Sequence, residues 1–470
     1  MKRIGIIGAG FSGTMTAVHL LQNASEPIEL FIINQKESFI RGIAYNPYSQ
    51  KHLLNVPTAK MGAFADKPGH FLDWVMQQKN YSDKEKEIVG NSFLPRFLYG
   101  DYLENVWKET VNFPKAKRST VKIIESIVSD AALENNACIL SLDNGEKITV
   151  DYCVLASGNH LPGNPKIKNT AFYQSKNYFR NPWDKKAVSN LGSDKPVLII
   201  GNGLTMVDTV LGLLEQGFTN SIYSISPNGF NILPHRHIGL KYTKMADELS
   251  HTHTLRDIVR LFNKHIKLIR DFGLSAEPLI DSLRPHTQEI WLRLTQDEKR
   301  LFMGRLRHLW GVARHRIPLH IHDKLQQLRI DKKLFIRSGK LNDIIERDGN
   351  IEVSFFDKKE KHEEKIFVSR VINCTGPETD LIKLENSYLK NLLERGVIFQ
   401  DELKLGINAD VKTFNAADKN GNSHKNIFVI GSNLKGMLWE STAVNELREQ
   451  AERIAKNILQ STKTEKFVAA

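Results

Sequence analysis

The same short pattern occurs twice in this chain, and it limits the possible folds more than any other feature. An apolar stretch at 3–7 predicts a buried strand, and it runs into the glycine turn Gly8-Ala9-Gly10-Phe11-Ser12-Gly13 and then a helical stretch. A second copy runs from the apolar stretch 196–200 into Gly201-Asn202-Gly203 and another helical stretch. Self-similarity of this kind predicts repeated structural units. We therefore expect two strand–turn–helix–strand units, whose second strands lie at 28–33 and 221–225.

Each copy is closed by a predicted β-meander and a strand that ends in Ser-Gly or Thr-Gly. The first meander is predicted from strands at 121–127, at 138–142 and near 147, and the unit ends at Ser157-Gly158. The second unit ends at Thr375-Gly376. Alternating strands and helices of this kind predict an α/β fold with two Rossmann-like dinucleotide-binding domains.

The remaining segments define the domain boundaries that we expect. A stretch with helical periodicity, rich in Leu, Arg and His, predicts a helical insert at 243–328. A last strand at 426–430 leads through Gly431 into a helix predicted at about 439–459. We predict one discontinuous domain from 1–170 and 370–470, and a second from 185–369 that includes the insert.

Composition excludes several classes of protein. The 470 residues are 41% hydrophobic and 25% charged, as in globular proteins, and no apolar run reaches the ~20 residues of a membrane helix. The net charge of +12 has no arginine-rich tail beside it, so we expect no nucleic-acid partner, and an anionic small substrate or plain solubility accounts for the charge. Cys138, Cys153 and Cys374 lie far apart in sequence without a C-x-x-C motif, which favours a reducing, cytoplasmic compartment and no redox dithiol. The oligomeric state is not predicted.

The first glycine turn predicts a pyrophosphate site. Gly8 permits the tight turn, Gly10 lets the backbone approach the ligand, and Gly13 lets the helix pack on the strand. The N–H groups of Phe11 and Ser12 at the helix start face the phosphates. Asn34 stands at the end of the second strand, where an acid usually binds the ribose hydroxyls; it can accept one hydrogen bond, Glu37 can replace it, or the position is only a polar strand end.

The second glycine turn predicts a nicotinamide nucleotide at Gly201, Gly203 and Thr205. Met206 stands where a third glycine is usual, and Ser226-Pro227-Asn228-Gly229 contains no arginine for a 2′-phosphate. These features favour NADH over NADPH, or a second site that has lost its function.

Three further sets of residues are candidates for the site. Gly158, Gly431 and Ser432 lie at strand ends expected to border the first nucleotide, with the last helix directing its positive N-terminus at it. Arg314 and Arg316 in the insert can clamp a carboxylate, although charge on a helix is more often solvated. Four histidines invite a metal site, but no carboxylate or cysteine accompanies them at ligand spacing, so we expect no metal. They are His235, His237, His251 and His253.

Several segments together resemble the FAD/NAD(P)-binding protein family, which includes flavin-dependent monooxygenases that N-hydroxylate aspartate. The segments are 8–13, 41–45, 52–57, 71–74, 203–208, 310–318, 436–444 and 446–448. The resemblance implies a three-layer, glutathione-reductase-like fold, FAD at the first unit and the C-terminal element, and NADH or NADPH at the second. It also implies that Asn55 faces the flavin.

The leading hypothesis is an FAD-dependent, NAD(P)H-using oxidoreductase of monooxygenase type that acts on a small anionic or amine substrate such as an amino acid. The absence of a nucleophile–base arrangement fits this hypothesis, because a flavin carries the difficult chemistry. One alternative is a flavin dehydrogenase or electron-transfer reductase that does not activate oxygen. Another is a non-catalytic nucleotide-binding protein with a decayed second site.

Overall fold

The computed structural model describes residues 1–192, 194–236, 240–347, 349–385 and 387–468, with side chains described to Ser461. The chain divides into two compact units. Unit 1 comprises 1–47, 56–160 and 379–470, and unit 2 comprises 48–55 and 161–378. We had placed the boundaries near 170 and 370, and had not expected the short segment 48–55 to belong with the second unit.

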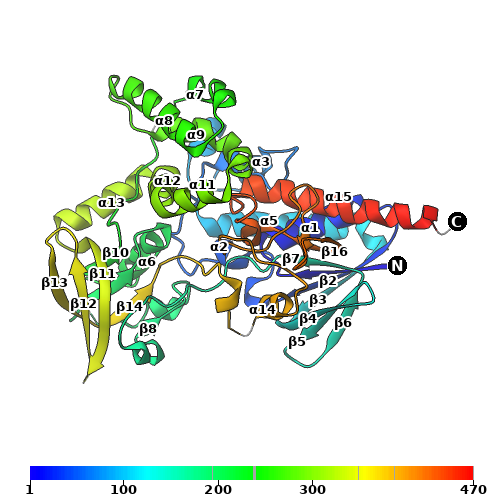
Figure 1. Cartoon of the computed structure of the whole chain (residues 1–470), viewed down its shortest axis with the longest axis horizontal. Coiled ribbons are helices and arrows are strands. Elements are labelled where there is room, and N and C mark those ends of the chain that lie inside the picture. The colour runs from blue at the N-terminus through cyan, green and yellow to red at the C-terminus, as the bar shows by residue number, and fades with distance from the viewer. Residues whose placement is uncertain (193, 237–239, 348, 386, 469–470) are drawn as a thin grey trace. The chain divides into compact units, whose positions relative to one another are not determined.

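Unit 1 contains a six-stranded sheet in the order β15-β16-β7-β1-β2-β3 and a three-stranded sheet β4-β5-β6 (Figure 1). The strands are β1 Lys2–Ile7, β2 Ile28–Asn34, β3 Thr120–Glu125, β4 Val128–Glu134, β5 Ala137–Leu142, β6 Lys147–Val150, β7 Tyr152–Leu155, β15 Asn415–Ala417 and β16 Ser423–Val429. The helices are α1 Phe11–Asn23, α2 Gly42–Tyr45, α3 His70–Met76, α4 Lys86–Asn91, α5 Arg96–Asn112, α14 Tyr388–Glu394 and α15 Val444–Val468.

The predicted strand 121–127 was assigned to the wrong sheet. Its residues up to Glu125 form β3, which pairs in parallel with β2 and extends the main sheet. The meander instead consists of β4, β5 and β6, which pair antiparallel. Only two residues separate β3 from β4, so the apolar run did not show where one strand ends and the other begins, or which sheet each one joins.

Unit 2 is built on a seven-stranded sheet in the order β13-β12-β11-β10-β9-β14-β8. Its strands are β8 Tyr178–Phe179, β9 Val197–Ile200, β10 Ile222–Ser226, β11 Leu334–Arg347, β12 Asn350–Asp357, β13 His362–Val368 and β14 Arg370–Asn373. Its helices are α6 Leu204–Glu215, α7 Lys244–Asp247, α8 Leu255–Arg270, α9 Glu277–Leu283, α10 Thr287–Arg293, α11 Gln296–Leu301, α12 Arg307–Arg314 and α13 Leu319–Ile330. Strand β11 joins the parallel and antiparallel parts of this sheet, because its first half pairs in parallel with β10 and its second half pairs antiparallel with β12.

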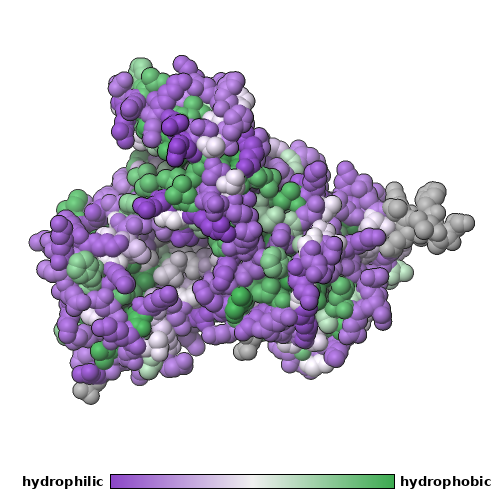
Figure 2. Space-filling view, in the orientation of Figure 1, coloured by the Kyte–Doolittle hydropathy of each residue, from purple (hydrophilic) through white to green (hydrophobic). Residues whose placement is uncertain are grey.

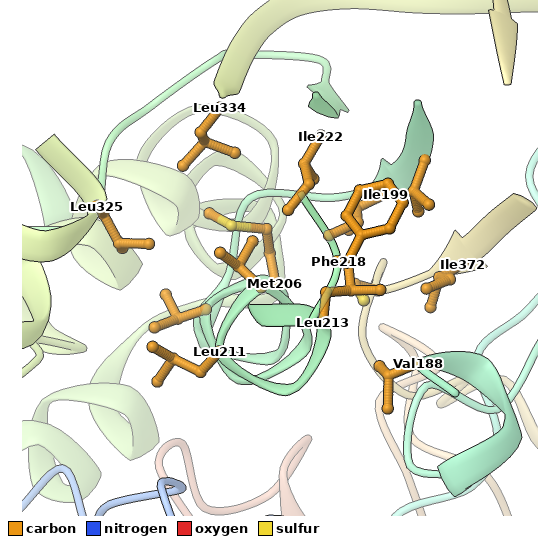
Figure 3. Packing of buried hydrophobic residues seen from close by; sticks show 14 of the residues in the cluster. Val188, Ile199, Met206, Leu211, Leu213, Phe218, Ile222, Leu325, Leu334 and Ile372 are labelled. Atoms are coloured by element: carbon orange, nitrogen blue, oxygen red, sulfur yellow. The ribbon is translucent and has the colours of Figure 1, made fainter. Parts of the chain in front are cut away.

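Strand β9 is buried on both faces, as its uninterrupted apolar sequence predicts. Val197 and Ile199 pack into one core with α6 and α13, whereas Leu198 and Ile200 pack into a second core with the meander strands. Figure 3 shows α6 end-on inside the first core, with its own Met206 and Leu213 and with Ile222 of β10 in the same cluster.

The helical insert is confirmed and has a core of its own. Helices α7 to α13 span Lys244 to Ile330, close to the predicted 243–328. Met245, Leu249, Leu261, Leu279 and other buried residues form a separate apolar cluster within it. Figure 1 shows α7, α8 and α9 gathered together. Among the residues that the structure describes, no helix is long and apolar enough to span a bilayer, and the face in Figure 2 is mainly hydrophilic.

A buried histidine on α1 predicts loss of stability in acid. His19 lies edge-on to Phe64, and burial lowers the pKa of its ring from 6.5 to about 4, although Asp66 opposes part of the shift. The imidazole of the unfolded chain therefore binds a proton below pH 6.5, whereas that of the folded chain binds it only near pH 4. The free energy of unfolding falls as the pH falls through this window. Between pH 7 and pH 4 the free energy of unfolding of a His19→Leu variant, measured in urea, should fall by roughly 1–3 kcal/mol less than that of the parent protein. An exposed-site control, His251→Leu, should follow the parent profile, and equal slopes for all three proteins would contradict the assignment.

Candidate dinucleotide sites

The first glycine turn lies where the carboxyl ends of β1, β2 and β7 meet, since these strands run parallel. Gly8 has φ +100°, and a Cβ added to it would lie 2.3 Å from the carbonyl oxygen of Ala156. A Cβ on Gly13 would lie 1.9 Å from the carbonyl oxygen of Gly8. Both positions therefore require glycine so that α1 and β7 can approach the turn.

The N-terminus of α1 is open to a ligand. Its N-cap is Gly10, which has no side chain to bond the first N–H groups. A Cβ on Gly10 would have only the Cα of Gly42 within 4 Å, at 3.5 Å. Exposed N–H groups and the helix dipole favour an anion here, so the residues fit a pyrophosphate. Gly42, with φ +57°, borders this space and was not singled out from the sequence, although the segment 41–45 was part of the resemblance.

The C-terminal element reaches the same place within unit 1. A Cβ on Gly431, at φ +80°, would lie 3.3 Å from Ser12 Oγ, and Asn433 Nδ2 donates to Ser157 Oγ over 3.1 Å, next to Gly158. Ser432 Oγ is buried and has no hydrogen-bond partner among the described residues. A buried hydroxyl of this kind is costly unless a ligand or water satisfies it, so it marks a place for a polar ligand atom.

The last helix does not start where we expected. Residues after Gly431 form a short 3₁₀ turn and further turns, and α15 begins only at Val444. A side-chain link connects the two segments: Gln450 Oε1 accepts from Gly431 N–H at 3.1 Å, and Ser441 Oγ donates to Gly431 O at 2.8 Å. The helix therefore supports the strand end through Gln450, and its N-terminus does not follow the strand directly.

Asn34 holds the glycine turn. Its Oδ1 accepts from Ala9 N–H at 3.1 Å, and its Nδ2 donates to Gln35 O at 2.7 Å and Ser38 Oγ at 2.9 Å. An amide has about four hydrogen-bonding positions, so only one acceptor position is left for a ribose hydroxyl.

The second glycine turn repeats the backbone geometry of the first. Gly201 has φ +111°, and its Cβ would lie 2.4 Å from Cys374 O, as that of Gly8 would from Ala156 O. Gly203 is the N-cap of α6 without a side-chain cap, and a Cβ there would have no atom within 4 Å. Thr205 lies half-buried in the first turn of this helix. The turn is thus open for a second phosphate group.

Met206 does not close the second turn. Its side chain is 1% exposed and packs into the apolar core shown in Figure 3. The missing third glycine has therefore been replaced by a core residue, and Ser224 Oγ anchors the turn by donating to Gly201 O at 3.0 Å.

A Gly203→Ala variant should impair nucleotide binding at the second site without affecting folding. The residue has φ −81° and free space around it, so alanine should leave the free energy of unfolding unchanged. The methyl group would stand where the backbone meets a phosphate, and we expect the KM for the nicotinamide nucleotide to rise roughly tenfold at unchanged flavin content. Stopped-flow flavin reduction measures this, and loss of flavin instead would contradict it.

Two predicted residues have other roles in the structure. Arg316 is 5% exposed, and its guanidinium pairs with Glu277 and Asp281. Because Glu277 and Asp281 already pair with this guanidinium, the contacts favour a structural ion pair, and the role of Arg316 as a substrate clamp stays a prediction. Arg314 is also buried, and its role in binding a substrate carboxylate remains a prediction. Asn55 lies in unit 2, where its carbonyl oxygen is 3.0 Å from His235 Nε2.

The histidines do not gather around a metal site. Burial lowers the pKa of His235 to about 4, whereas His251 and His253 are exposed. His237 lies outside the described residues. Within the part of the chain that the structure describes, no group of three or more metal-ligating side chains comes together.

Two cysteines that are distant in sequence are neighbours in the fold. The Cys153 thiol interacts with that of Cys138, and this contact together with burial raises the pKa of Cys153 well above its usual range. Both are buried thiols, so proximity does not make them a reactive dithiol.

Comparison with known proteins agrees with this geometry. Residues 5–160 match a family model described as FAD-NAD(P)-binding. This part of the chain is therefore similar to FAD-NAD(P)-binding domains. The match contains the first glycine turn and ends just after Gly158, so it covers the nucleotide-binding strand ends of unit 1 up to β7.

Three of the curated proteins that share sequence with the chain illustrate the likeness. An uncharacterised Escherichia coli protein, YdhS, is 26% identical over 46% of this chain and 40% of its own. The Baeyer-Villiger monooxygenase ATR8 of Stachybotrys chlorohalonatus is 25% identical over 51% of this chain and 36% of its own. The nitrosuccinic acid synthase npaA of Aspergillus oryzae is 21% identical over 70% of this chain and 54% of its own. The chain thus spans between about a third and about half of the length of these relatives.

A solved structure confirms the fold over the whole length. Ornithine N-hydroxylase from Kutzneria sp. 744 superposes with a TM-score of 0.67 at 12% identity, covering 98% of this chain and all of that chain. The predicted α/β class with two dinucleotide-binding domains is confirmed.

Proposed function

We propose that the protein is an FAD-dependent oxidoreductase of monooxygenase type that uses NAD(P)H and oxidises the nitrogen of a small amine or amino acid. The observation that carries the proposal is the pair of glycine turns, each opening an uncapped helix N-terminus, at Gly10 in unit 1 and at Gly203 in unit 2. One chain with two such turns is suited to hold two dinucleotides. The monooxygenase and synthase among the relatives support the oxygen chemistry.

In this proposal, unit 1 holds FAD. The N-terminus of α1 binds the pyrophosphate, and the unsatisfied Ser432 hydroxyl donates to a polar atom of the ligand near the end of β16. FAD bound here would supply the redox chemistry between NAD(P)H and oxygen. Unit 2 holds the nicotinamide nucleotide at Gly201, Gly203 and Thr205.

The substrate is proposed to be an amino acid, with aspartate the first to test. Nitrosuccinic acid, named for one relative, has the carbon skeleton of aspartate with a nitro group in place of the amine. The net charge of +12 favours an anion of this kind. A reducing, cytoplasmic setting also belongs to the proposal, supported by cysteines that are all free thiols.

The test is made on the purified full-length protein. It should be yellow, NADH or NADPH should bleach its flavin absorbance, and aspartate under ¹⁸O₂ should give a product with labelled oxygen on nitrogen, read by mass spectrometry. Ornithine and lysine serve as comparison substrates. Rapid flavin reduction and transfer of electrons to quinones or dyes, without labelled product from any amine, would replace the proposal with an electron-transfer reductase. A colourless protein that gains no flavin on reconstitution would overturn it altogether.

A further inference from the structure

The end of β10 is the place where folds of this kind hold the adenosine ribose of a nucleotide. Its last residue, Ser226, is followed by Pro227-Asn228-Gly229, so the loop offers neither the acid that binds the ribose hydroxyls of NAD nor an arginine. In the sequence these residues favour NADH over NADPH, but they are only the residues that directly follow the strand.

The fold brings a cation to this strand end from 131 residues beyond Pro227 in the chain. Lys358, the first residue after β12, directs its Nζ to the carbonyl oxygen of Pro227 over 2.6 Å. Ser338 Oγ donates to the same oxygen at 3.2 Å, and Ser338 is the register partner of Ser226. The backbone N–H of Lys358 donates to Ser338 O at 2.8 Å, so the position of Lys358 beside β10 is fixed by the sheet.

The surroundings of Lys358 leave it available to an anion. The carboxylate that precedes it in sequence, Asp357, is 1% exposed and accepts from the backbone N–H groups of Lys359 and Glu360. Its remaining charge faces Arg337, whose Nη1 lies 3.7 Å from Asp357 Oδ2. The Glu360 carboxylate lies 3.6 Å from the ammonium of Lys359. Lys358 is exposed, and among the described residues its ammonium bonds a carbonyl oxygen, which a phosphate can replace with a stronger, charge-assisted bond.

We propose that Lys358 makes unit 2 selective for NADPH by pairing with the 2′-phosphate of its adenosine ribose. Ser226 supplies a hydroxyl donor to the same phosphate, because its Oγ accepts from Gly229 N–H at 3.0 Å and its own hydrogen is left able to donate. Ser338 becomes a second donor when its hydroxyl turns from Pro227 O to the phosphate. This inference rests on the proposed function, since it assigns the nucleotide that the second site takes.

The test is calorimetric titration of the purified, flavin-loaded protein with 2′-phospho-ADP-ribose and with ADP-ribose. A charge-assisted contact should make the phosphorylated compound bind at least about tenfold more tightly. In a Lys358→Met variant the two affinities should agree within about twofold, while the affinity for ADP-ribose is unchanged. Lys359→Met is the matched control, because it removes a neighbouring exposed charge from the same turn and should keep the preference.

Two results would overturn the inference. One is equal binding of the two compounds by the parent protein, and the other is a preference that survives in Lys358→Met. Either can occur while NADH still bleaches the flavin, in which case the proposed function stands. Failure of both NADH and NADPH to reduce bound flavin would count against the proposed function itself.

Discussion

A Gly10→Ala enzyme is expected to fold normally and to bind FAD about 10- to 100-fold more weakly than the parent. The backbone at Gly10 has φ −76° and ψ −166°, which any residue adopts, and a Cβ would approach only the Cα of Gly42, at 3.5 Å. Folding therefore has no reason to fail. The new methyl group would stand at the N-terminus of α1, where the pyrophosphate is expected to approach the backbone.

The matched variant is Gly13→Ala, three residues away in the same turn. Its Cβ would lie 1.9 Å from the carbonyl oxygen of Gly8, an overlap that only a backbone shift can relieve. We expect it to lower the free energy of unfolding by several kcal/mol, because the first turn of α1 must move away from β1. Flavin-to-protein ratio by absorbance and thermal unfolding of the apoprotein separate the two effects. Full FAD affinity in Gly10→Ala would show that the nucleotide does not pass this helix end.

Local sequence was sufficient to predict the parts of the fold that depend on neighbouring residues. Gly8 and Gly201 both follow an apolar strand and precede a helix, and both adopt the positive φ that the turn requires. The buried strand β9 was likewise evident from its uninterrupted apolar sequence, and the helical insert from its helical periodicity. These features are recorded in the pattern of the residues that form them.

The parts that the sequence did not show depend on partners distant in sequence. Nothing near Arg316 shows that it meets Glu277 and Asp281 on α9, and nothing near Ser226 shows that Lys358 arrives from another strand. The residues up to Glu125 joined the parallel sheet because β2 offered an edge, which no feature of their own sequence records. The sequence therefore located the two glycine turns, whereas the charged residues around them became evident only from the fold.

Replacing Arg316 by methionine is expected to lower the stability of unit 2 by roughly 3 kcal/mol, because it leaves buried carboxylate charge without its main partner. Glu277 is only 12% exposed on its side chain and would retain Arg236, at 3.0 Å, as its remaining cation. In a unit of this size the loss corresponds to a fall in Tm of roughly 6–12 °C. Arg300→Met is the control, since Arg300 pairs with exposed Asp297 one helical turn away and its removal should cost less than about 0.5 kcal/mol.

The same variant decides between the two roles of Arg316. Adding Glu277→Gln and Asp281→Asn to Arg316→Met removes the uncompensated charges, so the triple variant should recover much of the lost stability. A residue that clamps substrate behaves differently: its loss raises KM for the amino acid, leaves Tm near that of the parent, and is not rescued by neutralising two carboxylates. Thermal unfolding of all three proteins beside steady-state kinetics distinguishes the outcomes. An unchanged Tm in Arg316→Met with a raised KM would restore the clamp, and the ion pair with α9 would then be incidental.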